Sequence, residues 1–185
     1  MIERPIDRQT VGEEMERTRA TFHTLVSEAS PADLRRASAG TRWTNKQLLF
    51  HMVFGYIIVR ALLRLVRVFG RLPDWSSRLF ARLLNASTRP FHLVNYLGSC
   101  GGALVFHGDR LTKKLDLTIA ALHRHLDQET DEALQCSMHF PVDWDPFFRE
   151  RMTLLDVYHF GAQHFEFHQR QLTLSQPDPY AGTTS

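Results

Sequence analysis

Apolar residues recur at helical spacing along much of the chain, and the first such stretch begins near Thr10. Thr10 and Glu13 have the form of a capping box, which predicts that a helix starts there after an extended lead-in over 1–9. One face of this helix is apolar, at Val11, Met15, Phe22, Leu25, Val26 and Ala29. Ser30 followed by Pro31 then predicts one short further turn of helix.

A second long helix is predicted to begin at a capping box of Thr44 and Gln47 and to end near Phe69. At about 100° per residue, an apolar stripe extends about 60° to either side of His51. The stripe contains Leu48, Gly55, Ile58, Leu62, Leu65, Val66 and Phe69. His51 is therefore a polar group in the middle of the face that should meet a core. The opposite face carries Arg60, Arg64, Arg67 and Arg71.

The pattern is less regular in the middle of the chain. It predicts a helix over 75–85 capped by Asp74, a short helix and loop over 91–102, a third long helix over 104–127 and an irregular connection over 128–143. His107 and His125 fall near the edge of the apolar face of the third long helix. They are candidate pocket groups, with a surface or structural role as the alternative.

A last helix is predicted over 147–172, because Asp145 followed by Pro146 is typical of a helix start. Its inward face contains Leu154, Val157, Phe160, Gly161, His164, His168, Gln171 and Leu172, while His159 and Glu166 point away. His164 and His168 thus lie one turn apart on one face, which is a metal-ligand spacing. Phe165 stands where a zinc protease of the His-Glu-x-x-His type has its glutamate, so that class is excluded.

Composition favours one soluble domain. The chain has 185 residues, of which 43% are hydrophobic and 23% charged, and we expect a domain over 1–174 with a disordered tail over 175–185. The longest apolar run, 47–59, is too short to span a bilayer, so no transmembrane helix is predicted. Cys100 and Cys136 are too few for a disulfide framework, which favours a cytoplasmic location.

The net charge of +2 argues against general nucleic-acid binding, but the positive charge is unevenly placed. Between Arg60 and Arg89 there are seven arginines and a single acidic residue, Asp74. This basic segment could meet nucleic acid, an acidic membrane surface or an acidic partner, or form a solvated face paired with carboxylates. It contains no recognisable DNA-reading motif, so no specific nucleic-acid partner is predicted.

Three histidines face inward on two different helices, namely His51, His164 and His168. Each alone is well explained as a hydrogen-bonded core residue, because a buried polar group needs only a partner. Together they favour a metal site, with Gln171 beside the pair to hold one imidazole in place. Imidazole ligands suit zinc, nickel, iron and copper alike.

The segment from Trp43 to His51 and the later segment from His164 to Leu172 resemble the DinB-like superfamily, which includes bacillithiol- and mycothiol-dependent enzymes. The resemblance implies an all-α, up-down-down-up four-helix bundle in which His51, His164 and His168 bind a divalent metal, commonly zinc or nickel. It also implies a homodimer. Two features depart from the pattern: Arg170 stands where members often have glycine, and extra short helices lengthen the connection between the second and third bundle helices.

Three neutral imidazoles leave a bound ion its full charge and an open position, which suits activation of a thiol or of water. The resemblance therefore favours an S-transferase or isomerase that uses a low-molecular-weight thiol and acts on a small molecule. A small metal-dependent hydrolase and a non-catalytic metal-binding or stress-associated interaction module are the alternatives.

Overall fold

Helices form most of the protein, as the sequence predicts. The computed structural model describes residues 6–175. In order, its elements are α1 (Arg8–Glu28), α2 (Pro31–Arg35), α3 (Asn45–Phe69), α4 (Asp74–Ala86), α5 (Thr88–Val105), α6 (Asp109–Gln128), α7 (Asp131–Leu134), β1 (Ser137–His139), β2 (Arg151–Thr153) and α8 (Leu154–Gln169). The tail expected over 175–185 lies, apart from Ser175, outside the described residues.

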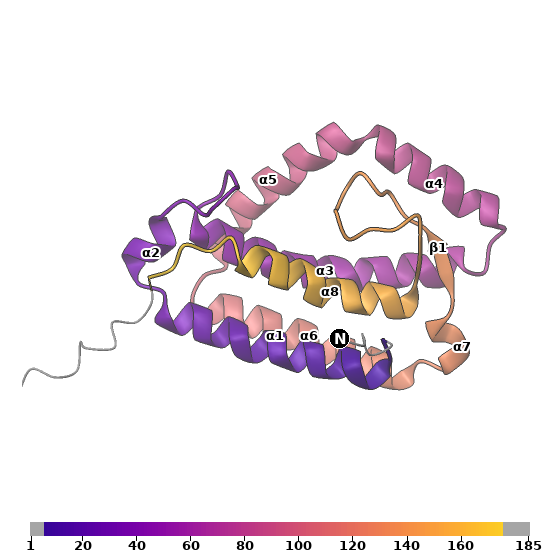
Figure 1. Ribbon diagram of the computed structural model, residues 1–185, viewed down its shortest axis with the longest axis horizontal. Coiled ribbons are helices and arrows are strands. Elements are labelled where there is room, and N and C mark those ends of the chain that lie inside the picture. The colour runs from indigo at the N-terminus through magenta and orange to yellow at the C-terminus, as the bar shows by residue number, and fades with distance from the viewer. Residues whose placement is uncertain (1–5, 176–185) are drawn as a thin grey trace, which may run out of the picture.

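Four long helices, α1, α3, α6 and α8, pack side by side around the core (Figure 1). α3 packs against α6 and α8, and α1 packs against the same two helices from the other side. In Figure 1 α4 and α5 form an arch over α3, and the loop between β1 and β2 lies beneath that arch. We call α4 and α5 together the arm. Residues of the arm, of α3 and of α8 line a cavity next to the candidate site.

Capping residues explain where three of the helices begin. The Thr44 side chain accepts a hydrogen bond from the backbone of Gln47, whose own side chain accepts from the backbone of Thr44, so α3 starts as predicted. Ser30 and Asp33 cap α2 in the same reciprocal way. The predicted start of α1 is two residues late, because the carboxylate of Asp7 accepts from the Thr10 N–H at 2.7 Å and caps the helix instead.

The arm differs from the prediction. A short helix and a loop were expected over 91–102, whereas α5 continues without interruption to Val105. Pro90 is the third residue of α5, a position whose N–H has no partner within a helix, so the proline is tolerated there. α6 begins at Asp109 rather than at 104 because Gly108, with φ 52°, turns the chain.

The prediction for 128–153 is also wrong in part. The connection expected to be irregular contains α7 and β1, and the helix expected from 147 begins only at Leu154. Thr153 and Asp156 form a capping box that starts α8 there, and the preceding residues pair as β2 with β1, where Met152 lies opposite Met138. Asp145 does not cap a helix and instead accepts from the N–H of Phe147 within a turn.

The two faces of α3 have different surroundings. Met52, Val59 and Leu63 are at most 1% exposed in the core. Ile58 and Leu62, from the stripe centred on His51, instead line a cavity beneath the arm. By length and composition α3 is the one described helix that could cross a membrane, but 56% of its most apolar window is buried, as in the core helix of a soluble protein.

Candidate metal centre

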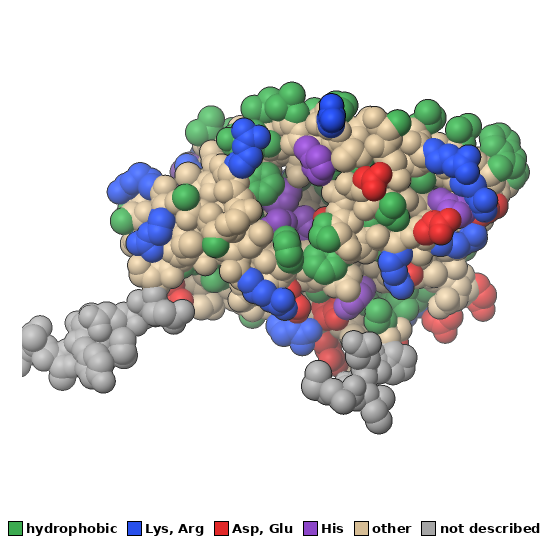
Figure 2. All heavy atoms as spheres, turned by 45° about the horizontal axis from the view of Figure 1, so that its top comes forward, with side chains coloured by type: hydrophobic (Ala, Val, Ile, Leu, Met, Phe, Trp, Pro, Cys, Tyr) green, Lys and Arg blue, Asp and Glu red, His purple; other side chains and the backbone are tan. Residues whose placement is uncertain are grey.

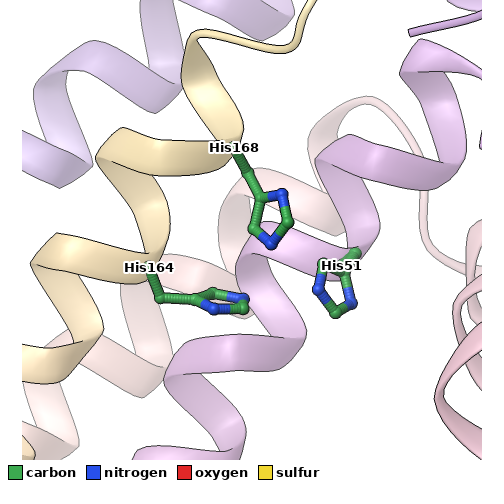
Figure 3. A group of neighbouring side chains, drawn as sticks. All are labelled: His51, His164 and His168. Carbon is green, nitrogen blue, oxygen red and sulfur yellow. The ribbon is translucent and has the colours of Figure 1, made fainter. Parts of the chain in front are cut away.

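The structure brings the three inward histidines together at one point. His51 projects from α3, and His164 and His168 project from successive turns of α8 (Figure 3). One ring nitrogen of each histidine lies within 4.8 Å of the corresponding atoms of the other two. All three side chains are buried, between 4% and 8% exposed. Nitrogens at this spacing can reach one common ion.

Two of the imidazoles are held by side-chain acceptors. The Nδ1–H of His168 donates to Oε1 of Gln171 at 2.7 Å, the residue expected beside the pair. The Nδ1–H of His164 donates to Oδ2 of Asp145 at 3.1 Å. Because a carboxylate and an amide oxygen only accept, they place the ring proton on Nδ1 and leave the lone pair of Nε2 free, which is the ligand form of histidine.

His51 is held by the arm and by a tryptophan. Its Nδ1 lies 3.1 Å from Oγ of Ser99, a fully buried residue of α5. The ring of Trp43 stacks on the His51 ring with centroids 4.4 Å apart. All three Nδ1 atoms therefore have partners. When the Ser99 hydroxyl accepts from the Nδ1–H of His51, the Nε2 lone pair of His51 is available for a ligand, as it is in the other two histidines.

Burial keeps two of the imidazoles, those of His51 and His168, neutral. Loss of water around His51, and then the neighbouring His164 and His168, lower the pKa of His51 to about 2. Burial, followed by His164, lowers the pKa of His168 to about 4. Neutral imidazoles are the form that binds metal. Nε2 of His164 is buried without a hydrogen-bond partner among the described residues, and such an atom is rare unless something binds it.

A glycine makes room for this arrangement. A Cβ atom added to Gly55 on α3 would lie 2.5 Å from Cδ2 of His164, closer than real contacts allow. Gly55 therefore lets the His164 ring lie close against α3, and any larger residue would displace the ring.

A cavity of about 570 Å³ adjoins the histidines beneath the arm. Figure 2 shows histidine side chains within a hollow on the face that the arm overhangs. Its walls come from α3, α4, α5, α8 and the loop between β1 and β2. A volume of this size suits one small organic molecule, so the three nitrogens lie where a substrate could reach them.

The other candidate histidines lie elsewhere. His107 is exposed in the connection between α5 and α6, and His125 is exposed on α6; neither lines the cavity. The position predicted for His107 on the third long helix is wrong, because α6 begins only at Asp109 and His107 lies before it. His92, which the helical pattern did not single out, does line the cavity. His159 points away from the site, as predicted, and its Nδ1 lies 2.8 Å from a carboxylate oxygen of Glu14.

Two contacts of the site were not predictable from spacing. Asp145 belongs to a loop and Ser99 to the arm, and both reach the histidines only through tertiary packing. The Asp145–Pro146 pair is visible in the sequence, but it is typical of a helix start and does not indicate a contact with His164.

The basic segment does not form part of the site. Arg67 pairs with Glu129, and Arg78 pairs with Asp74 at 3.0 Å, so carboxylates neutralise some of it. Arg64 and Arg82 are exposed to solvent on α3 and α4. The segment is thus divided among α3, α4 and α5 and is partly paired, as expected for a solvated face.

Comparison with known protein families assigns the chain to one of them. The model of the DinB superfamily matches residues 14–172, a span that includes all three histidines and most of the chain. No curated protein and no solved structure matches it. The family match agrees with the resemblance carried by the segments around His51 and around His164 and His168, and the chain belongs to the DinB superfamily.

Proposed function

We propose that the protein is a divalent-metal-dependent enzyme whose ion is held by His51, His164 and His168. The convergence of three buried imidazoles, each with its Nδ1 already engaged, carries this proposal. An all-imidazole set fits zinc or nickel. Such an ion supplies Lewis-acid chemistry, lowering the pKa of a thiol or water bound at an open position.

We further propose that the reaction is transfer or isomerisation that uses a low-molecular-weight thiol and a small-molecule substrate. The described lining of the cavity contains one carboxylate, Asp145, and this group already accepts from His164. The chain thus offers no free carboxylate base there, which favours a nucleophile that is acidic to begin with. Thiols satisfy this condition better than water. A small hydrolase and a non-catalytic metal-binding module remain the alternative functions.

Metal analysis tests the first part of the proposal. We expect about one equivalent of zinc or nickel in the purified protein, and loss of this metal in His51→Ala and in the double variant His164→Ala/His168→Ala. His107→Ala is the matched control, because His107 is exposed and outside the cavity. Stoichiometric metal in the double variant would refute the site.

Activity needs a separate measurement. The metal-loaded protein is incubated with bacillithiol, mycothiol or glutathione and a panel of electrophiles, and thiol consumption is followed. Metal-dependent turnover that His51→Ala abolishes would support the thiol-dependent reaction. Ester or amide hydrolysis without thiol consumption would favour the hydrolase instead.

We infer that α1, α3, α6 and α8 correspond to the up-down-down-up bundle of the family, with the arm inserted between its second and third helices. The directions of the four helices support this: α1 and α8 run toward the α2 end of the molecule in Figure 1, whereas α3 and α6 run away from it.

We also infer that two copies associate through the outer face of the arm. No charged residue occurs over 90–108. The apolar side chains on the outside of the arm are between 50% and 76% exposed, and they include Trp75, Leu79, Leu83, Leu93, Leu97 and Leu104. A monomer rarely exposes so continuous an apolar surface. Light scattering should find a dimer that Leu97→Glu dissociates. Leu117→Glu, at an exposed position of α6, should leave the dimer intact. A monomeric wild-type protein would contradict this.

A further inference from the structure

We propose that the cavity beneath the arm binds an elongated, uncharged and largely apolar molecule, with a polar head group against the histidines. This proposal extends the proposed function by naming the class of the non-thiol substrate. It rests on the proposed metal site only for the binding of the polar head group.

The cavity is elongated along α3. His51 and Leu65 both line it from this helix, and they are 14 positions apart. A helix rises about 1.5 Å per residue, so these two lining positions are separated by about 21 Å along the axis. A compact ligand would fill only part of this length.

Polar and apolar groups are separated along the cavity. Trp43, Asp145 and the three histidines lie together at one end, where the rings of Trp43 and His51 stack. Among the other lining residues His92 and Asn95 of α5 are polar. The remainder are apolar or glycine, and they include Ile58, Leu62, Leu65, Phe80, Met138 and Phe140. Burying a ligand's hydrocarbon against such a wall is favourable by about 25 cal/mol per Å².

The charges of the lining exclude an ionic tail. No lysine or arginine is among the described lining residues, and Asp145, the one acidic residue, is engaged by His164. A carboxylate or ammonium placed in the apolar part would lose its water without gaining a partner. The polar, often ionic body of a low-molecular-weight thiol therefore does not fit there, which leaves this space to the electrophilic partner.

Two buried polar atoms at the histidine end lack partners within the described protein. They are Nε1 of Trp43 and Nε2 of His164. Buried donors and acceptors are usually satisfied. A head group that binds the ion and accepts from the Trp43 N–H would engage this end, while the hydrocarbon body would lie along α3.

Binding of a neutral apolar dye tests the cavity without metal. When metal-free protein is titrated into N-phenyl-1-naphthylamine, the fluorescence of the dye should rise and reach a plateau. Leu65→Trp and the milder Ala61→Phe, both in the lining, should weaken binding at least tenfold. Leu117→Trp places the same ring at an exposed position of α6 and should leave dye binding unchanged. Circular dichroism verifies folding; equal binding by a folded lining variant and by the control would overturn the proposal.

A chain-length series tests the head and the body together. Acetohydroxamic, butyrohydroxamic and octanohydroxamic acids are titrated into the cobalt-loaded protein, and the cobalt absorption reports the bound head group. Each added CH₂ should strengthen binding up to about fourfold, the equivalent of about 0.8 kcal/mol. Ala61→Phe should remove the gain for the longest acid but not the binding of the shortest.

The outcomes separate the two proposals. A protein that fails to bind cobalt but binds the dye in its lining-dependent way would refute the metal site and leave the apolar cavity. A protein that binds cobalt, with hydroxamate affinities independent of chain length and no dye binding, would overturn the apolar substrate class and leave the metal site.

Discussion

The two faces of α3 are both apolar in sequence, but one packs in the core and the other lines a cavity. On one face Met52, Val59 and Leu63 are packed against neighbouring helices and at most 1% exposed. On the other, Ile58, Leu62 and Leu65 are the same kinds of residue but border a cavity. The first face stabilises the fold through close packing, and the second leaves apolar surface incompletely buried. An apolar face is therefore not by itself a core face, and the difference comes from the arm.

The largest predicted effect compares neighbouring leucines on these two faces. Leu63→Ala should lower the free energy of unfolding by about 2–5 kcal/mol, because it leaves a void in a packed core. Leu62→Ala should cost less than about 1.5 kcal/mol, because it only enlarges an existing cavity. Urea unfolding of both variants provides the measurement. Equal losses would mean that the arm packs against α3 and that no cavity exists in solution.

A pair of glycines tests how closely the site is packed. Gly55→Ala should reduce metal affinity about 10- to 100-fold, because its Cβ would displace the His164 ring. Gly98→Ala is the control: Gly98 also lines the cavity, but an added Cβ there meets no atom within 4 Å. Competition with a chromophoric chelator measures both. Unchanged affinity in Gly55→Ala would show that the ring position does not matter for binding.

The loop carboxylate should have a smaller effect. Asp145→Asn keeps the size of the side chain and can keep a weaker hydrogen bond to His164, so we expect a loss of metal affinity of about tenfold. Asp143→Asn is a matched control in the same loop. An Asp145→Asn variant with wild-type affinity would indicate that burial alone orients His164.

The helical faces of the site histidines could be predicted from the sequence because they depend only on helix periodicity. His51, His164 and His168 were assigned to inward faces, and Gln171 was expected near the pair; the structure brings all four together. His159 was directed away, and it contacts Glu14. The angle between two side chains around a helix axis depends only on the number of residues between them. The predicted faces of α8 are therefore correct even though its predicted start is wrong by several residues.

Other features of the fold and the site could not be predicted, because two local patterns competed or because contacts distant in sequence decide them. Asp145–Pro146 and Thr153–Asp156 are both acceptable helix starts, and pairing of β2 with β1 decides for the second. The break at Gly108 moved His107 out of the helix to which it was assigned. Ser99 reaches His51 only because the arm folds back over α3, and no spacing along the chain indicates that.

The smallest predicted effect is a pH dependence of the packed face. Tyr56 is 1% exposed, its hydroxyl donates to Oγ1 of Thr18 at 3.0 Å, and burial raises its pKa above the usual value. The folded state thus disfavours the phenolate. The resulting stabilisation is fully present below about pH 10, the pKa of an exposed tyrosine, and is lost as pH rises through the folded pKa.

Urea unfolding between pH 8 and pH 11 measures this dependence. Above about pH 10 the free energy of unfolding should fall by up to about 1.4 kcal/mol per pH unit for Tyr56. Tyr158, also buried and with a pKa raised to about 12, adds its own slope, so Tyr56→Phe should remove only part of the total. A slope that Tyr56→Phe leaves unchanged would mean that water reaches this hydroxyl. The packed face of α3 would then be as open as the cavity face, and the contrast between them would fail.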